Sequence, residues 1–154
     1  MLWKSLAFSE LSLNELYDLL KLRVDVFVVE QNCPYPELDD KDRHAQTQHL
    51  LGLNEQGVIQ AYARVLAPGV SYPDASIGRV IVAGSARGGG VAHTLMQKAI
   101  AISTKKWPEH NIQLGGQEHL KAFYQQQGFE PVSEMYLEDG IPHIDMLRVT
   151  KVEA

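Results

Sequence analysis

Several features that would assign this 154-residue chain to familiar protein classes are scarce or missing. It has one cysteine, Cys33, which excludes an internal disulfide and is typical of a reducing compartment. No apolar run reaches the roughly 18 residues that a membrane span requires, and the N-terminal residues lack the apolar centre of a signal peptide. We therefore expect a cytoplasmic protein that does not bind a membrane.

Patterns for nucleic-acid and metal binding are also missing. The formal net charge of −5 argues against a nucleic-acid partner, because phosphates favour basic patches, and it suits a cationic amine better. The six histidines show no His-x-x-x-His spacing and the chain has no Cys-x-x-Cys, so we expect no metal. The acidic stretch 39–42 lacks the glycine and closing glutamate of a calcium loop, and we interpret it as a solvated run of charge.

The residues that are present predict one domain over 1–154, since 45% of them are apolar and no linker or repeat interrupts them. Ser12 and Glu15 form a capping box, which predicts a helix that ends near Phe27. A second helix should end before Trp107-Pro108, and a third at Gly128. The pattern gives an α+β protein with helices on both faces of a mixed sheet. The expected strands are 2–8, 49–53, 58–65, 77–82, 112–114, 131–137 and 143–149, and the expected helices are 13–27, 91–103 and 117–127.

The most informative stretch is Arg87-Gly88-Gly89-Gly90-Val91-Ala92, which lies between the apolar run 77–83 and an amphipathic helix. The first N–H groups of a helix have no partner within it and carry the positive end of the helix dipole. Glycines let a phosphate approach without meeting a Cβ, and Arg87 adds a permanent positive charge. We interpret the stretch as a pyrophosphate site, with a plain chain-reversing turn as the alternative.

Two nucleotide motifs do not fit this stretch. A P-loop needs Lys-Ser or Lys-Thr after its last glycine, whereas Val91 follows Gly90 here. A dinucleotide site needs a third glycine, where this chain has His93, and an acid about 20 residues further on at a strand end. The acid at that distance, Glu109, follows Trp107-Pro108 in an expected loop.

Three groups of residues together resemble a known family. Arg87-x-x-Gly90-x-Ala92 is similar to the (Gln/Arg)-x-x-Gly-x-(Gly/Ala) signature of the GNAT superfamily, the acyl-CoA-dependent N-acetyltransferases. Residues 120–129, Leu-Lys-Ala-Phe-Tyr-Gln-Gln-Gln-Gly-Phe, resemble that superfamily's Leu-x-x-Phe-Tyr-x-x-x-Gly-Phe helix. Residues 22–35, 49–52, 61–64 and 138–144 resemble the ElaA-like branch. The resemblance covers most of the chain.

The resemblance implies a GNAT fold, with a mostly antiparallel sheet of about six or seven strands, and acetyl-CoA as co-substrate. The main chain of Val80, Ile81 and Val82 would hold the pantetheine, and one N–H there would face the thioester oxygen. The turn and helix start would hold the pyrophosphate, and Phe123 would pack beside the coenzyme or in the core. The residues so implied at the pyrophosphate are Arg87, Gly88, Gly89, Gly90, Val91 and Ala92.

Tyr124 is the candidate general acid under the same resemblance. By itself, its spacing with Leu120 and Phe123 is typical of a core-facing helix surface. A phenol with a reference pKa near 10 can donate a proton to a leaving thiolate with one near 8.5.

The general base is less well defined by the sequence. Many GNAT members carry a glutamate on the cofactor strand, but residues 77–82 contain no carboxylate. Glu30, His143 and Asp145 are the candidate substrate contacts, and an ordered water is an equal alternative as base. His143 and Asp145 alternate with Ile144, which places them on one face of a strand.

The expected function is acetyl transfer to an unidentified primary amine by direct attack in a ternary complex. A sensor or interaction module that binds acyl-CoA without turnover is the alternative. The protein would be a monomer or a homodimer.

Overall fold

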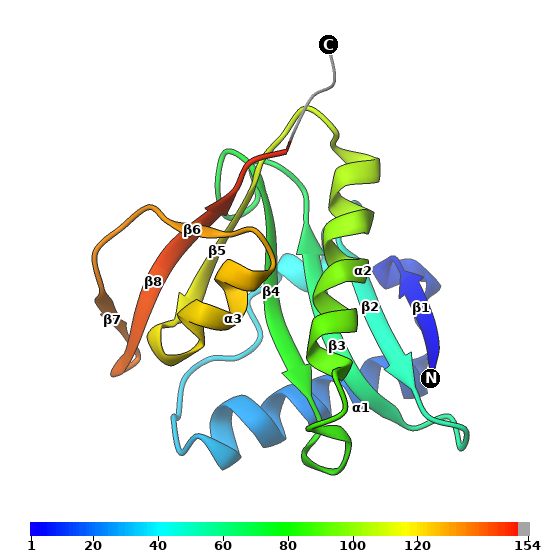
Figure 1. Ribbon diagram of the computed structural model, residues 1–154. Coiled ribbons are helices and arrows are strands. Elements are labelled where there is room, and N and C mark those ends of the chain that lie inside the picture. Colours follow the sequence, from blue (N-terminus) through cyan, green and yellow to red (C-terminus); the bar gives the residue numbers. More distant parts are fainter. Residues whose placement is uncertain (151–154) are drawn as a thin grey trace.

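The computed structural model describes residues 1–150 and contains one eight-stranded sheet (Figure 1). Its strand order is β1-β2-β3-β4-β5-β8-β6, and β7 pairs with β8. All pairings are antiparallel except that of β4 with β5. The strands are β1 (Leu2–Leu6), β2 (Gln48–Leu53), β3 (Ile59–Leu66), β4 (Ala75–Val82), β5 (Ile112–Gln117), β6 (Glu130–Pro131), β7 (Tyr136–Glu138) and β8 (Ile141–Arg148).

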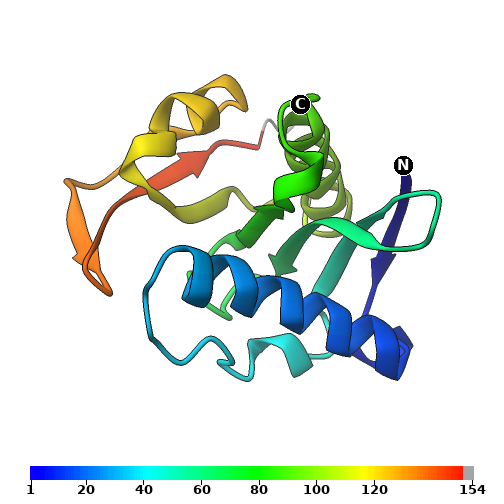
Figure 2. The same cartoon turned by 90° about the horizontal axis from the view of Figure 1, so that it is seen from below.

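Helices cover both faces of this sheet, as expected (Figure 2). Helix α1 (Leu13–Arg23) packs on one face through an apolar cluster that includes Leu19 and Tyr62. Helices α2 (Val91–Lys106) and α3 (Lys121–Gln126) lie on the other face over a second cluster. The capping box is present, because the Ser12 hydroxyl accepts from the Glu15 N–H at 3.0 Å and the Glu15 carboxylate accepts from the Ser12 N–H at 2.9 Å.

Short helical turns join these elements. They are η1 (Phe8–Glu10), η2 (Val24–Glu30), η3 (Lys41–Arg43), η4 (Gly84–Ala86) and η5 (Glu118–Leu120). The helix predicted to end near Phe27 is an α-helix only to Arg23 and then continues as the π-helical η2 to Glu30. The predicted helix 117–127 is divided into η5 and α3, and Gly128 follows with a left-handed φ of +91°.

The remaining boundaries differ in length. Helix α2 runs three residues beyond the predicted Ser103, and β5 extends to Gln117. The strand predicted over 131–137 is wrong as one element, because β6 and β7 pair with separate parts of β8. That division accounts for eight strands where six or seven were expected.

Strands β4 and β5 lie beside each other for only part of their length and then separate (Figure 1). They pair at two positions, Ala75 with Ile112 and Ser76 with Gln113. From Ile77 onward, no strand of residues 1–150 pairs with the edge of β4 that faces β5, so its main-chain N–H and C=O groups there are available to another partner.

The separation coincides with a bulge in β4. The register of β4 against β3 shifts between Gly78 and Ile81, and Arg79 there has a φ of +52°, which is unusual for a residue with a side chain. A bulge bends its strand and increases the local twist. The bend therefore turns the C-terminal half of β4 away from β5.

Candidate active site

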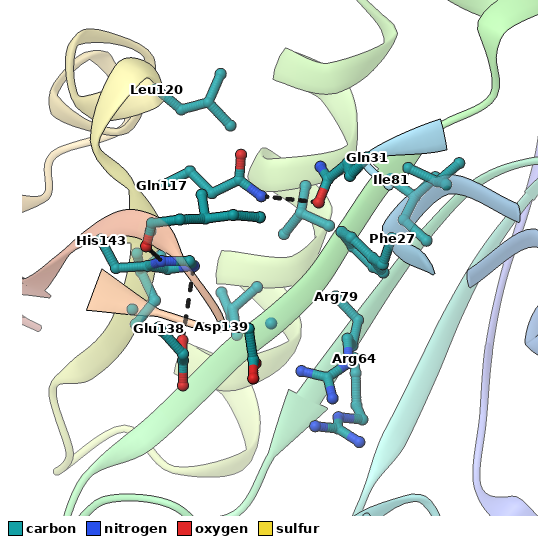
Figure 3. A pocket seen from close by; sticks show the side chains of 18 of the residues that line it. Phe27, Gln31, Arg64, Arg79, Ile81, Gln117, Leu120, Glu138, Asp139 and His143 are labelled. Carbon is teal, nitrogen blue, oxygen red and sulfur yellow. Dashed lines mark hydrogen bonds and ion pairs between the residues drawn. The ribbon is translucent and has the colours of Figure 1, made fainter. Parts of the chain in front are cut away.

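A cleft of about 1130 Å³ occupies the space between the separated strands. Side chains from both faces of the sheet line it: Phe123 and Tyr124 of α3 from one face, and Tyr35, Tyr72 and His143 from the other. Figure 3 shows the part of the cleft around His143, where residues from η2, β4, β5 and the β7–β8 turn converge. The cleft therefore passes through the sheet.

The predicted coenzyme strand forms one wall of the cleft. Val80, Ile81 and Val82 all line it, and their strand continues into the glycine turn before α2. A second hollow of about 340 Å³ adjoins this end and is lined by residues of the turn and of α2, with Phe123. The residues from the turn and helix start that line it are Arg87, Gly88, Gly90, Val91, Ala92 and His93.

The glycine turn is open to a ligand. Gly88 and Gly90 have left-handed φ values of +96° and +76°, and a Cβ built on Gly88, Gly89 or Gly90 would meet no atom within 4 Å. Within residues 1–150 no hydrogen bond is donated by the N–H groups of residues 88–93, and the first bond of α2 runs from Thr94 to the Gly90 carbonyl. These unpaired amides can bind an anion.

Arg87 is held by protein groups rather than projecting freely. Its guanidinium donates to both oxygens of Glu30 at 2.8 and 2.9 Å and to the Val82 carbonyl at 2.8 Å. The hydrogen bonds from Arg87 lower the pKa of Glu30, so this carboxylate stays ionised. The pair links the end of η2 to the end of β4, and both residues line the cleft.

Tyr124 lies at the α3 side of the cleft and is 6% exposed. Its ring packs edge-on against Phe123 and Phe129, and a Cβ on Gly116 would come within 2.8 Å of it. Burial raises the pKa of the Tyr124 hydroxyl to about 12, so the phenol is protonated at neutral pH. No hydrogen-bond partner for this hydroxyl is found among residues 1–150.

His143 and Asp145 share one face of β8, as their alternation predicts, but only His143 lines the cleft. The His143 side chain is 12% exposed and stacks on Tyr136. The Asp145 carboxylate accepts a 2.6 Å hydrogen bond from the Tyr136 hydroxyl, and burial together with that bond raises the pKa of Tyr136.

A buried network of charges on the α1 side was not predicted. Arg23, with no exposed surface, donates to Glu37 and Asp42, and Arg79 makes two bonds to Glu37 at 2.8 and 2.9 Å. Arg64, on β3, binds both oxygens of Asp39 at 2.8 Å and Asp42 at 3.1 Å. Arg64, Arg79 and Asp39 also line the cleft.

The interpretation of residues 39–42 as a solvated run is therefore wrong for two of its acids. Asp42 is 6% exposed, and burial by itself would raise the pKa of Asp39. The Arg64 guanidinium outweighs burial and holds the pKa of Asp39 at about 2. The signal available in the sequence was Arg64 within the apolar run Ala61–Leu66, because an arginine on a central strand needs carboxylate partners.

In residues 1–150, no group of three or more His, Cys, Asp or Glu side chains is arranged to hold a metal ion. None of the helices there is both long and apolar enough to cross a bilayer.

Comparisons with known proteins agree with this geometry. Residues 22–149 match the sequence model of the acetyltransferase (GNAT) domain family. The chain is 48% identical over 146 residues to protein ElaA of Escherichia coli K12, and the match covers 95% of each chain.

Solved structures give the same result. An acyl-CoA N-acyltransferase from Pseudomonas aeruginosa is similar with a TM-score of 0.91 and 42% identity, over 97% of this chain and 100% of that one. Escherichia coli ElaA is similar with a TM-score of 0.90 and 47% identity, over 96% and 99% of the two chains.

Proposed function

The chain belongs to the GNAT superfamily of acetyltransferases, in its ElaA-like family, and on this premise we propose that it transfers the acetyl group of acetyl-CoA to a primary amine. The observation that carries the proposal is the unpaired edge of β4, which leads directly into the open glycine turn at the start of α2. An extended pantetheine needs such an edge, and a pyrophosphate needs such a turn.

The residues present fit coenzyme A. The main chain of Val80, Ile81 and Val82 would pair with the pantetheine, and Phe123 would pack beside it. The amides of residues 88–92, unpaired within the described chain, would bind the pyrophosphate, and the absence of any atom within 4 Å of a Cβ on the three glycines leaves room for it. Arg87 would add positive charge, although its guanidinium is shared with Glu30.

Two protein groups would assist the transfer itself. A main-chain N–H of β4 aimed at the thioester oxygen would stabilise the developing negative charge by about 3 kcal/mol. Tyr124 would donate a hydrogen bond to the leaving sulfur. Transfer from a phenol with a pKa of about 12 to a free thiolate with a reference pKa near 8.5 is uphill by about 5 kcal/mol. The phenol would therefore hydrogen-bond to the sulfur and give up its proton only as it takes the one that the attacking nitrogen loses.

Direct attack by the amine is favoured over an acyl-enzyme. Cys33 also lines the cleft, but it is 7% exposed and its thiol donates to the Asp139 carbonyl at 3.3 Å. That contact holds the sulfur at the β7–β8 turn. The amine would instead enter from the α1 face and meet the thioester in the gap between the strands.

The test is acetyl-CoA-dependent release of thiol with a panel of primary amines: spermidine, glucosamine, an alanyl peptide and Nα-acetyl-lysine. Tyr124→Phe should lower kcat about 100-fold with the accepted amine and change the acetyl-CoA Kd less than twofold by calorimetry. Tyr17→Phe is the matched control, because Tyr17 is 70% exposed on α1 and lies outside the cleft.

The outcomes separate an enzyme from a sensor. Binding of acetyl-CoA without thiol release for any amine in the panel would favour the sensor. Full activity of Tyr124→Phe would contradict the role of Tyr124.

A further inference from the structure

The proposed reaction requires a group that removes a proton from the amine, and we propose that His143 is this general base. The assignment rests on the proposed function and adds a catalytic residue to it. An alkyl amine such as a lysine side chain has a reference pKa near 10.4, so it reaches the cleft mostly as an ammonium ion without a lone pair.

The one hydrogen bond that the imidazole makes within residues 1–150 fixes where its lone pair lies. Nδ1 of His143 is 2.7 Å from the carbonyl oxygen of Ile141. A carbonyl can only accept, so Nδ1 carries the proton of the neutral ring. The lone pair therefore belongs to Nε2, which makes no hydrogen bond shorter than 3.5 Å within residues 1–150.

His143 also lies on the opposite side of the cleft from Tyr124, where a base would complement that acid. His143 pairs with Gln117 across β5 and β8, and their side chains share the face of the sheet opposite to the one covered by α3. Figure 3 shows the imidazole in the cleft between Gln117 and the Glu138 carboxylate. His143, the proton acceptor, and Tyr124, the proton donor, thus line the same cleft from opposite faces of the sheet. The amine and the leaving sulfur lie on different sides of the thioester carbon, so an acceptor and a donor on opposite faces can serve one each.

The other two candidates have their oxygens committed elsewhere. Both oxygens of Glu30 accept from Arg87, which lowers the pKa of this carboxylate and makes it a poorer proton acceptor. Asp145 accepts from the Tyr136 hydroxyl at 2.6 Å and is not part of the cleft lining. Of the three, His143 alone lines the cleft with an acceptor atom that receives no hydrogen bond within residues 1–150, since its charged neighbour, the Glu138 carboxylate 3.6 Å away, has no proton to donate.

The charged groups that face or flank the His143 imidazole are carboxylates. Glu138 of β7 places a carboxylate oxygen 3.6 Å from Nε2, and the Tyr136 ring of the same strand stacks on the imidazole. Asp139 follows in the turn, and Asp145 lies two residues along the same face of β8. On β5 the facing neighbour, Gln117, is uncharged.

Two protons leave the nitrogen during the transfer. Nε2 takes one proton from the ammonium group, and the freed nitrogen lone pair forms a bond to the thioester carbon. The C–S bond then breaks with its electron pair on sulfur. The second proton lost by nitrogen ends on that sulfur through the Tyr124 hydroxyl, and the imidazolium releases its proton to solvent. The products are the amide, the free thiol and one proton.

The test compares His143→Asn with the unchanged protein over pH 7–9.5, using Nα-acetyl-lysine and the alanyl peptide as acceptors. Asparagine keeps an N–H that can donate to the Ile141 carbonyl but cannot take a proton. At pH 7 we expect kcat/KM for the lysine amine to fall about 100-fold or more, while the acetyl-CoA Kd changes less than twofold. The deficit should shrink about tenfold per pH unit as hydroxide deprotonates the amine, and it should be smaller for the α-amine, whose reference pKa is near 7.7–8.0.

Two more variants keep the test decisive. His44→Asn, an exposed site outside the cleft, should keep full activity. Glu138→Gln leaves the imidazole in place and removes its facing carboxylate, so it should lower kcat/KM at pH 7 about two- to fivefold. It supplies a second result if His143→Asn fails to fold.

The outcomes distinguish the two levels of the proposal. A deficit in His143→Asn that is the same at every pH would mean a positioning role and would overturn the assignment, as would full activity at pH 7. In either case the acetyl transfer measured for the unchanged protein would still support the proposed function. Acetyl-CoA binding without turnover in the unchanged protein would overturn both.

Discussion

Asp39 provides a quantitative test of the buried network, because its pKa is low and its partner is known. Its pKa is about 2 in the folded protein against an ordinary value of 3.8, and its side chain is 24% exposed. This lowering of the pKa corresponds to about 2 kcal/mol of stability. Because the folded-state pKa is lowered, this contribution is fully present above pH 4 and is lost as the pH falls towards 2.

Asp39→Asn removes the charge and keeps a similar shape. At pH 6 we expect its free energy of unfolding to be lower than that of the unchanged protein by about 2 kcal/mol. At pH 3 about half of the contribution remains, so the difference between the two proteins should shrink by about 1 kcal/mol. Urea denaturation followed by the fluorescence of Trp3 and Trp107, which both pack against the core, measures this at each pH.

Asp40→Asn is the matched control for this experiment. Asp40 is the neighbouring residue, its side chain is 87% exposed, and its ion pair with Arg43 is on the surface. Asparagine also tolerates the left-handed φ of +64° at this position. The control should change stability by less than about 0.5 kcal/mol. A difference for Asp39→Asn that is equally small, or that does not vary between pH 6 and pH 3, would refute the reasoning.

Two further predictions concern the cleft. Gly90→Leu should weaken acetyl-CoA binding at least tenfold by calorimetry. Gly57→Leu is its control, because Gly57 on the β2–β3 turn has the same φ of +76° and equally open space, so it should lose similar stability without losing affinity. Equal affinity for both variants would mean that the pyrophosphate lies elsewhere. Gly116→Ala places a methyl group 2.8 Å from the Tyr124 ring, so the kcat of acetyl transfer should fall about tenfold or more. The control Gly84→Ala, whose methyl group meets nothing within 4 Å, should keep the kcat of the unchanged protein. If kcat is unaffected in Gly116→Ala, the ring position is not important for the transfer.

The features that the sequence predicted correctly are those encoded by neighbouring residues. The capping box needs only Ser12 and Glu15, three residues apart, and it forms as expected. Gly128, predicted to stop the third helix, follows α3 with a left-handed φ of +91°, a conformation that glycine tolerates. Family membership also followed from the sequence, because each motif occupies one continuous stretch of chain.

The features that were missed depend on residues far apart in the chain. Glu37 binds Arg23, 14 residues before it, and Arg79, 42 residues after it, and no local pattern selects those partners. The left-handed φ of Arg79 was equally hidden, since glycine or asparagine is the usual sign of such a backbone. The ion pair of Arg87 with Glu30 spans 57 residues and required the π-helical extension of α1.

The missed network and the predicted coenzyme strand meet at Arg79. This residue has the left-handed φ at which β4 bends, a conformation that costs roughly 1–2 kcal/mol for a residue with a side chain. Its guanidinium makes two hydrogen bonds to Glu37, whose other partner is the fully buried Arg23. These bonds offset the backbone cost and fix the bend, and the bend opens the gap that the proposed reaction needs. The ion pairs on the α1 face therefore hold open the cleft in which, as we propose, Tyr124 and His143 act from opposite sides.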